Sequence, residues 1–285
     1  LRALLSRRFP GATVIELRRL ATDEAPDDAT RKGTGFGVPV RVRLREAGGR
    51  ERLLVFHTAR ADDFGHDRRA DRAQEMLLAY DTFGRVPRHV AALDVGVIGV
   101  DGTLRSIADA GELYLLTEWA DGQIYAEDLR RIAQRGLGPD DLRRVEALAD
   151  YLVALHAERS GPPAVYTRAV RDLIGAGEGI FGMVDGFPGD VPGAPPARLQ
   201  QIEALALGWR WRLRGREHRL ARTHGDFHPF NVVFAADDSI AVLDASRGCA
   251  GDPADDLAAL AINYVFFALD HPTSWTAAFG RMWRE

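Results

Sequence analysis

The chain has 285 residues, of which 46% are hydrophobic and 27% charged, and its formal net charge is -4. This composition is typical of a globular protein with one large or two ordinary domains. The acidic balance gives no general attraction to nucleic acid or to an anionic membrane surface. Cys249, the single cysteine, excludes an internal disulfide framework and fits the reducing cytoplasm. The longest apolar run, residues 257–269, contains Asn263 and is too short to cross a bilayer, so it predicts a buried helix.

Alternation of apolar and polar residues predicts that the first part of the chain is rich in strands. In chain order we expect a helix over residues 1–9, strands over 13–20, 36–45 and 52–59, a helix near 67–80, and strands over 88–100 and 113–120. Pro39 lies inside the second strand, which predicts an edge position or a bulge because proline lacks an N–H group. Asp121-Gly122 follows the last strand as a linker signal.

Beyond residue 120 the apolar spacing becomes helical. We expect a helix over residues 140–158, a long Gly/Pro-rich loop over 175–196, a helix over 198–213, two short strands, and a helical C-terminus. The simplest organisation is two lobes, residues 1–120 and 121–285. The first is small and β-rich, the second larger and mainly helical.

The stretch THGDFHPFNVVF, residues 223–234, places four polar side chains directly before an apolar run: His224, Asp226, His228 and Asn231. Imidazole and carboxylate groups suit zinc and similar ions, so the first three could form the metal site of a hydrolase. The plainer interpretation is a polar turn whose side chains satisfy backbone groups. Taken alone, the cluster leaves both interpretations open.

A second pattern favours phosphoryl transfer. NVVF and IAVL, joined by the turn AADDS, predict a hairpin that brings Asn231 close to Asp244 and leaves Asp226 in the preceding loop. Two oxygen ligands of this kind hold magnesium on phosphates, while a nearby carboxylate receives or orients the acceptor hydroxyl.

With these residues the chain resembles the aminoglycoside phosphotransferase and choline kinase superfamily of small-molecule kinases. HGDFHPFN is similar to its catalytic loop H-G-D-x-H-P-x-N, and VLDASRGCAGDPADDLA is similar to its metal-binding strand end followed by G-D-P-x-x-D-L-A. The resemblance implies a two-lobed, protein-kinase-like α+β fold that uses ATP and Mg²⁺. It makes Asp226 the catalytic base, Asn231 and Asp244 the magnesium ligands, and Asp256 a brace for the catalytic loop.

The resemblance assigns the nucleotide site to the N-terminal lobe. In KGTGFG, Gly33, Gly35 and Gly37 fit a glycine-rich loop whose backbone amides approach phosphates. In TEWA, backbone groups of Glu118 and Ala120 would bind the adenine edge.

His57 departs from the family pattern, because it stands where a kinase carries the lysine that holds the α- and β-phosphates. Glu75 is the expected helix glutamate, and its carboxylate would favour a protonated His57. Histidine is shorter than lysine and not permanently charged, so weakened or altered ATP handling is predicted. Ser246, two residues after Asp244, replaces an acidic residue of many relatives and leaves the number of magnesium ions open.

The sequence therefore predicts an ATP- and Mg²⁺-dependent phosphotransferase that transfers the γ-phosphate to a hydroxyl of a small molecule in the cytoplasm. Neither nucleic acid nor a membrane is expected as a partner, and the acceptor's identity and the oligomeric state are open. The alternative is a catalytically impaired kinase-like protein that binds a ligand or acts as a scaffold. His57 favours this alternative, and the intact Asp226, Asn231 and Asp244 argue against it.

Overall fold

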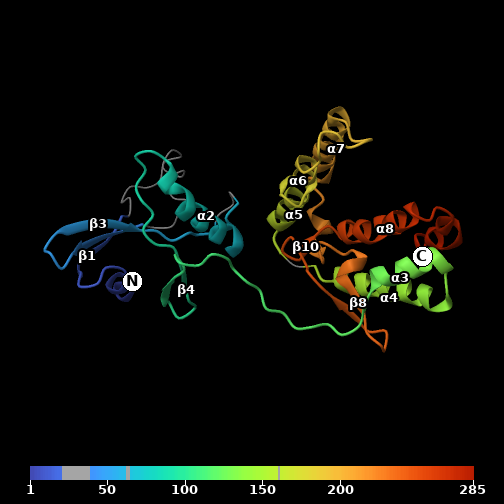
Figure 1. Ribbon diagram of the computed structural model, residues 1–285, viewed down its shortest axis with the longest axis horizontal. Helices are drawn as coiled ribbons and strands as arrows, with labels where there is room; N and C mark the ends of the chain where they lie inside the picture. The colour runs from blue at the N-terminus through green and yellow to red at the C-terminus, as the bar shows by residue number, and fades with distance from the viewer. Residues whose placement is uncertain (21–38, 62–64, 160) are drawn as a thin grey trace. The chain divides into compact units, whose positions relative to one another are not determined.

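The computed structural model shows an α+β protein (Figure 1) and describes residues 1–20, 39–61, 65–159 and 161–285. The described residues form two compact units, Leu1–Leu116 and Thr117–Glu285. No helix in these described ranges is long and apolar enough to cross a membrane.

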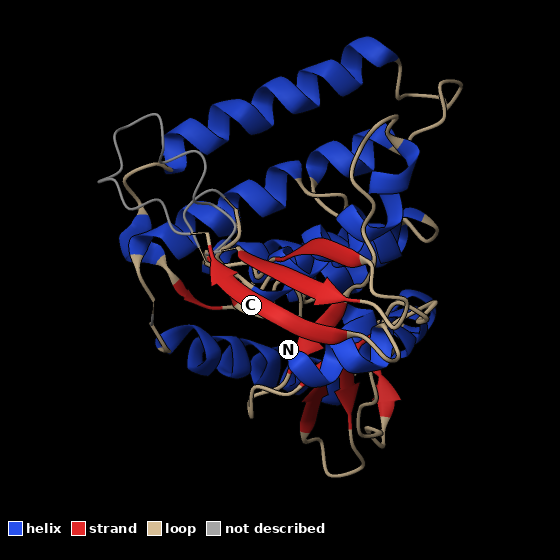
Figure 2. Ribbon diagram, turned by 90° about the vertical axis from the view of Figure 1, so that its left-hand side faces the viewer, coloured by secondary structure: helices blue, strands red, loops and turns tan. Residues whose placement is uncertain are grey.

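The first unit contains short helices and small antiparallel sheets. Its elements are α1 (Arg2–Arg8), β1 (Thr13–Arg19), β2 (Val40–Arg45), β3 (Glu51–Phe56), α2 (Arg69–Thr82), η2 (Phe83–Arg85), β4 (Gly96–Ile98) and β5 (Leu104–Ser106). The strands pair in the order β1-β2-β3, and β4 pairs with β5. Figure 2 draws the strands of the protein in red and its helices in blue.

Alternation in VRVRLR explains why β2 is the centre of the first sheet. Val42 and Leu44 point into the unit's core and are almost completely buried, with Leu5 of α1 packed against them. The arginines that alternate with them point to the other face, where Arg41 pairs with Glu16 of β1 at 3.2 Å. One face of the sheet is therefore apolar and the other is held by ion pairs between neighbouring strands.

Three predictions for this unit need correction. Pro39 lies before β2 rather than inside it, and its carbonyl accepts a hydrogen bond from Leu20, so a central strand forms without any loss of an N–H donor. The strand expected over 88–100 is limited to β4, because only three of its residues find a partner in β5. The run 113–120 forms no strand, since no described segment pairs with it.

The second unit is mainly helical. Its helices and 3₁₀ turns are α3 (Tyr125–Arg135), α4 (Pro139–Ala157), α5 (Pro163–Gly175), α6 (Ile180–Asp185), α7 (Pro196–Leu213), η3 (Glu217–Arg219), η4 (Pro229–Asn231), α8 (Pro253–Leu269), the π-helix η5 (Trp275–Phe279) and α9 (Gly280–Met282). Its strands are β6 (Gln123–Ile124), β7 (Ala221–Arg222), β8 (Val232–Phe234), β9 (Ile240–Val242) and β10 (Ala250–Gly251), paired as β6-β8-β9 and β10-β7.

The main core of this unit joins α3, α4 and α8 to the hairpin β8–β9. Val145, Leu148 and Leu152 follow one another at helical spacing on α4 and are buried there, as the sequence predicts. The buried Phe227 and Val232 come from the polar-to-apolar stretch around β8. The core therefore holds the stretch with the candidate catalytic residues against the helices.

A smaller core packs α5 and α7 together around Tyr166, Val170 and Ala206, with α6 beside them (Figure 1). The region 175–196 was expected to be loop throughout, which is wrong for residues 180–185. These six residues form α6, because Ile180 and Phe181 pack on the same apolar cluster.

Candidate active site

A buried carboxylate fixes the backbone of the loop between β7 and β8. Asp256, in the first turn of α8, is completely buried and accepts hydrogen bonds from the backbone N–H groups of His224 (2.9 Å) and Gly225 (2.8 Å). The Nε2 atom of His156, on α4, lies 2.9 Å from the same carboxylate. Three donors compensate the charge, as a buried carboxylate requires. Asp256 braces the loop in the manner the resemblance implies.

Gly225 is required by a close approach of two chain segments. Its φ angle is +84°, and a Cβ atom there would lie 2.5 Å from the carbonyl oxygen of Ser246. Ser246 in turn donates its backbone N–H to the carbonyl of His224 at 2.8 Å. Only glycine combines this backbone conformation with this contact.

His224 has a structural place in the loop. Its Nδ1 atom accepts the backbone N–H of Asp226 at 3.3 Å, and the side chain is buried against Phe227. Its Nε2 atom is buried and has no hydrogen-bond partner among the described residues. The imidazole shapes the turn that presents Asp226.

Asp226 and Asn231 meet directly. The Nδ2 group of Asn231 donates to the backbone carbonyl of Asp226 at 3.0 Å and to its Oδ2 atom at 3.3 Å. The Asn231 side chain is buried, whereas that of Asp226 is 43% exposed. A buried amide therefore orients a carboxylate that is open to solvent.

The hairpin brings Asp244 to the same end of the sheet. Val232 pairs with Val242, and the next hydrogen bond runs from the Leu243 N–H to the Asn231 carbonyl at 2.9 Å. Asp244 is the residue after Leu243; it is exposed and has a φ angle of +52°. A non-glycine residue held in this region costs about 1–3 kcal/mol, and such strain clusters at functional sites.

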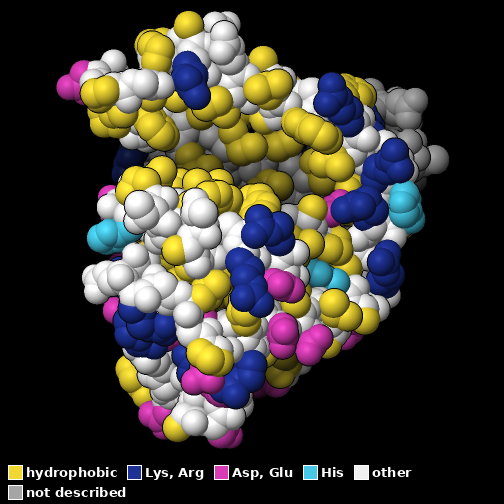
Figure 3. Space-filling view, turned by 90° about the vertical axis from the view of Figure 1, so that its right-hand side faces the viewer, with side chains coloured by type: hydrophobic (Ala, Val, Ile, Leu, Met, Phe, Trp, Pro, Cys, Tyr) yellow, Lys and Arg dark blue, Asp and Glu magenta, His cyan; other side chains and the backbone are white. Residues whose placement is uncertain are grey.

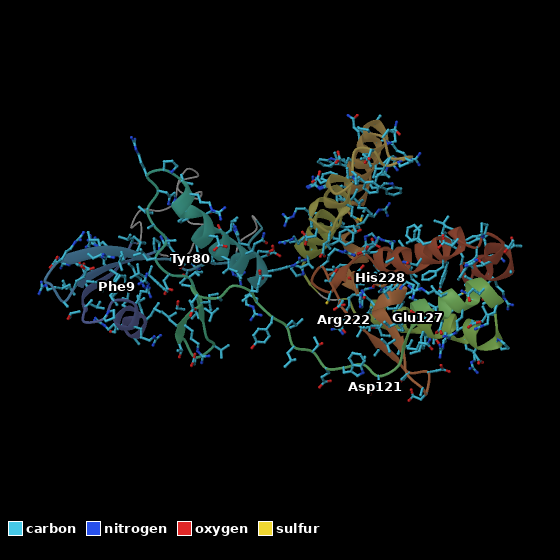
Figure 4. The ribbon with its side chains drawn as sticks, in the orientation of Figure 1. Phe9, Tyr80, Asp121, Glu127, Arg222 and His228 are labelled. Carbon is cyan, nitrogen blue, oxygen red and sulfur yellow. The ribbon has the colours of Figure 1, made fainter. Side chains whose placement is uncertain are left out.

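His228, which is labelled in Figure 4, is the N-cap of the 3₁₀ turn η4. Its Nδ1 atom accepts the backbone N–H of Phe230 at 3.2 Å, and its Nε2 atom lies 3.4 Å from Oδ2 of Asp226. The imidazole therefore caps the turn with one nitrogen and approaches the exposed carboxylate with the other.

The donor set fits a hard divalent cation such as Mg²⁺. Within the described residues, the Oδ1 atom of Asn231 and the carboxylate of Asp244 have no hydrogen bond or ion pair, and the hairpin holds both residues at one end. Oxygen ligands of this kind suit Mg²⁺, which keeps several waters and binds few protein groups. No group of three His, Cys, Asp or Glu side chains in the described residues could hold a metal, so His224, Asp226 and His228 do not form the cluster that a zinc hydrolase would need.

A family model for the phosphotransferase enzyme family matches residues 41–285, which contain the whole of this site. The chain belongs to the phosphotransferase enzyme family. This membership confirms the resemblance to aminoglycoside phosphotransferases and choline kinases that was based on HGDFHPFN and the Asp244 motif. No curated protein matches the chain.

One acidic residue beside the site of this phosphotransferase was missed in the sequence. Asp255 pairs with Arg247 at 2.9 Å, and both side chains are largely buried. Burial raises the pKa of Asp255, Arg247 opposes that shift, and the carboxylates of Asp256 and Asp226 add to it. The motif G-D-P-x-x-D-L-A leaves this position unspecified, so the pattern gave no signal for it.

The candidate nucleotide residues of the first unit are only partly described. Gly33, Gly35 and Gly37 lie outside the described residues. His57 follows the end of β3, is exposed, and has no hydrogen bond or ion pair in the described part of the chain. Glu75 pairs instead with Nε2 of His66 at 3.2 Å.

His57 and Glu75 therefore form no hydrogen bond or ion pair with each other. His66 lies just before α2, and its side chain reaches Glu75 within that helix. This local contact occupies Glu75, which the family pattern would pair with the residue at position 57. Glu118 and Ala120 belong to the second unit, in a segment without regular structure. Glu118 is exposed and Ala120 half-buried.

Proposed function

We propose that this phosphotransferase transfers the γ-phosphate of ATP, with Mg²⁺, to a hydroxyl group of a small molecule. The contact between Asn231 and Asp226, at the end of the hairpin that also carries Asp244, is the observation that carries the proposal. A positioned carboxylate beside oxygen ligands for a divalent cation is the arrangement that phosphoryl transfer uses.

Each residue has a defined task in this proposal. Asp226 accepts the proton of the acceptor hydroxyl, and its exposure leaves it open to a substrate. Asn231 and Asp244 would hold Mg²⁺, which bridges phosphate oxygens and neutralises developing charge when bound. Asp256 and His224 keep the loop in place and do not touch the reacting atoms.

We assign nucleotide binding to residues 1–120, which comprise the first unit and the four residues after Leu116, and the acceptor site to residues 121–285. Gly33, Gly35 and Gly37 would approach the phosphates, and backbone groups of Glu118 and Ala120 would approach the adenine. His57 and Glu75 would lie near the α- and β-phosphates. The reducing cytoplasm suits both ATP and the free thiol of Cys249.

The second unit offers apolar surface for an acceptor. Large hydrophobic side chains are exposed on α7 and α8, among them Leu205, Trp209 and Phe266. Figure 3 shows hydrophobic side chains on both sides of a hollow in the face that it draws. Ligand sites are commonly concave and lined mostly by apolar groups, so this face supports binding of a small molecule.

The proposal is tested by Asp226→Asn, which keeps the shape of the side chain and removes its basicity. Transfer to an acceptor, or slow Mg²⁺-dependent hydrolysis of ATP with water as acceptor, should fall about 10²–10⁴-fold because a general base is lost. Nucleotide affinity, measured by calorimetry, should stay unchanged. Asp270→Asn, an exposed position in the same unit, is the matched control. Full activity of Asp226→Asn would refute the proposal.

A kinase-like protein that binds a ligand or acts as a scaffold is the second candidate. The lack of any described contact between His57 and Glu75 favours it, because the family's phosphate-holding ion pair is then missing. Tight nucleotide binding together with turnover that depends on Asp226 would exclude this candidate.

A further inference from the structure

The hydrogen bond from Phe230 to His228 fixes which ring nitrogen of His228 carries the proton. A backbone N–H can only donate, so the Nδ1 atom that faces the N–H of Phe230 at 3.2 Å must offer a lone pair. In the neutral ring the proton is then on Nε2. Because Nδ1 accepts the hydrogen bond that caps η4, the Nε2–H group of the neutral ring is free to donate.

This donor lies close to one oxygen of Asp226. Nε2 of His228 lies 3.4 Å from Oδ2 of Asp226, and Nδ2 of Asn231 lies 3.3 Å from the same oxygen. Within the described residues no hydrogen bond reaches Oδ1 of Asp226. The contacts are longer than ordinary N–H···O bonds, and catalytic contacts commonly tighten when a substrate binds.

The imidazole is held in place by its surroundings. Its ring meets that of Phe230 edge to face with 5.8 Å between centroids, and Phe230 stacks on Phe267 of α8. His228 is therefore fixed by the loop through Nδ1 and by α8 through Phe230. Such support is what a precisely oriented polar group needs.

We propose that His228 is a positioning residue that, together with Asn231, holds Oδ2 of Asp226 and leaves Oδ1 as the oxygen that takes the proton. This rests on the proposed function. In the transfer step the acceptor O–H bond breaks and its proton goes to Oδ1 of Asp226. The acceptor oxygen bonds to the γ-phosphorus, and the bond from that phosphorus to the β-phosphate oxygen breaks with its electron pair on ADP. His228 touches none of the reacting atoms.

Two variants separate orientation of Asp226 from capping of η4. His228→Asn keeps an acceptor near the position of Nδ1 and loses the donor, whereas His228→Gln brings an amide N–H near the position of Nε2 and loses the cap. For Mg²⁺-dependent ATP hydrolysis we expect His228→Asn to lower kcat roughly tenfold to a hundredfold, with KM for ATP unchanged. His228→Gln should keep most of kcat and lower Tm by a few degrees, on the order of the loss of one cap.

The reverse result would overturn the proposal: normal kcat in His228→Asn, with impaired kcat in His228→Gln, would make His228 a cap only. His271→Asn, at an exposed histidine of the same unit, is the matched control and should behave as the unmodified protein.

A second readout does not depend on catalysis. The ¹⁵N shifts of the His228 ring, assigned by their loss in His228→Asn, should show the Nε2–H form. A proton on Nδ1 would contradict the proposal whatever the kinetics. The Nε2–H form in a protein without any phosphoryl transfer would instead show that the proposed function is wrong while the hydrogen-bond arrangement is right.

Discussion

The loop around Asp226 and the region around His57 hold their charged side chains in opposite ways. In the loop, Asp256 has three donors and Asn231 makes two hydrogen bonds to Asp226. His57 has no partner among the described residues and Glu75 pairs with His66. The residues proposed for metal binding and proton transfer are therefore already arranged in the second unit, whereas His57 and Glu75, proposed to lie near the α- and β-phosphates, are not paired with each other.

The braced loop can be broken most severely at Asp256. Asp256→Ala leaves two backbone N–H groups and His156 without their acceptor in a buried site, so unfolding free energy should fall by about 3–5 kcal/mol. Chemical denaturation checks this, with Asp270→Ala as the control at an exposed aspartate. A loss below about 1 kcal/mol, the worth of an exposed ion pair, would mean that the loop does not depend on this carboxylate.

The difference between the loop around Asp226 and the region around His57 should become smaller when His57 is replaced by lysine. His57→Lys supplies a permanent charge at the position where the family carries lysine, and a charge-assisted hydrogen bond to phosphate is worth about 1.5–3 kcal/mol. KM for ATP should therefore fall roughly tenfold to a hundredfold. His271→Lys is the control for the added charge. Unchanged affinity and turnover in His57→Lys would contradict the account of this region.

A smaller effect is expected where α5 and η3 meet the start of α8. Burial raises the pKa of Asp252, but hydrogen bonds from Arg219, the Ala254 N–H and Tyr166 outweigh it and the net pKa is lowered. The stabilisation is full above the ordinary value of 3.8 and is lost as pH falls through the lowered pKa. Arg219→Met should cost about 0.2–1 kcal/mol near neutral pH. Thermal unfolding should show this difference shrink below pH 3.8, and a constant difference would be evidence against the pair.

Much of the candidate site follows from local sequence. The hairpin β8–β9 was predicted because two short apolar runs flank the polar turn AADDS, and Val232 does pair with Val242. That pairing alone brings Asn231 and Asp244 to one end. The contact between His156 and Asp256 could not be predicted, because the two residues are a hundred positions apart and meet only when α4 and α8 join the same core.

The fold was harder to predict where partners decide the structure. The apolar run at 113–120 has the composition of a strand, yet a strand exists only where another segment accepts its hydrogen bonds. Helix α3 was missed although Tyr125, Leu129 and Ile132 stand at helical spacing and are buried. Likewise, Glu75 pairs with His66 because α2 begins just after His66. The periodicity of the sequence predicts the start of a helix only to within a few residues, so it did not predict this partner.

The central claim, a nucleotide site that depends on the oxygen ligands of the hairpin, is tested most directly by calorimetry. The protein and Asp244→Ala are titrated with an ATP analogue that resists hydrolysis, with and without Mg²⁺, and Asp270→Ala is the matched control. We predict binding that requires Mg²⁺ and is lost in Asp244→Ala but not in Asp270→Ala. No binding at millimolar nucleotide to the folded protein would contradict the account and favour a kinase-like protein that does not catalyse transfer.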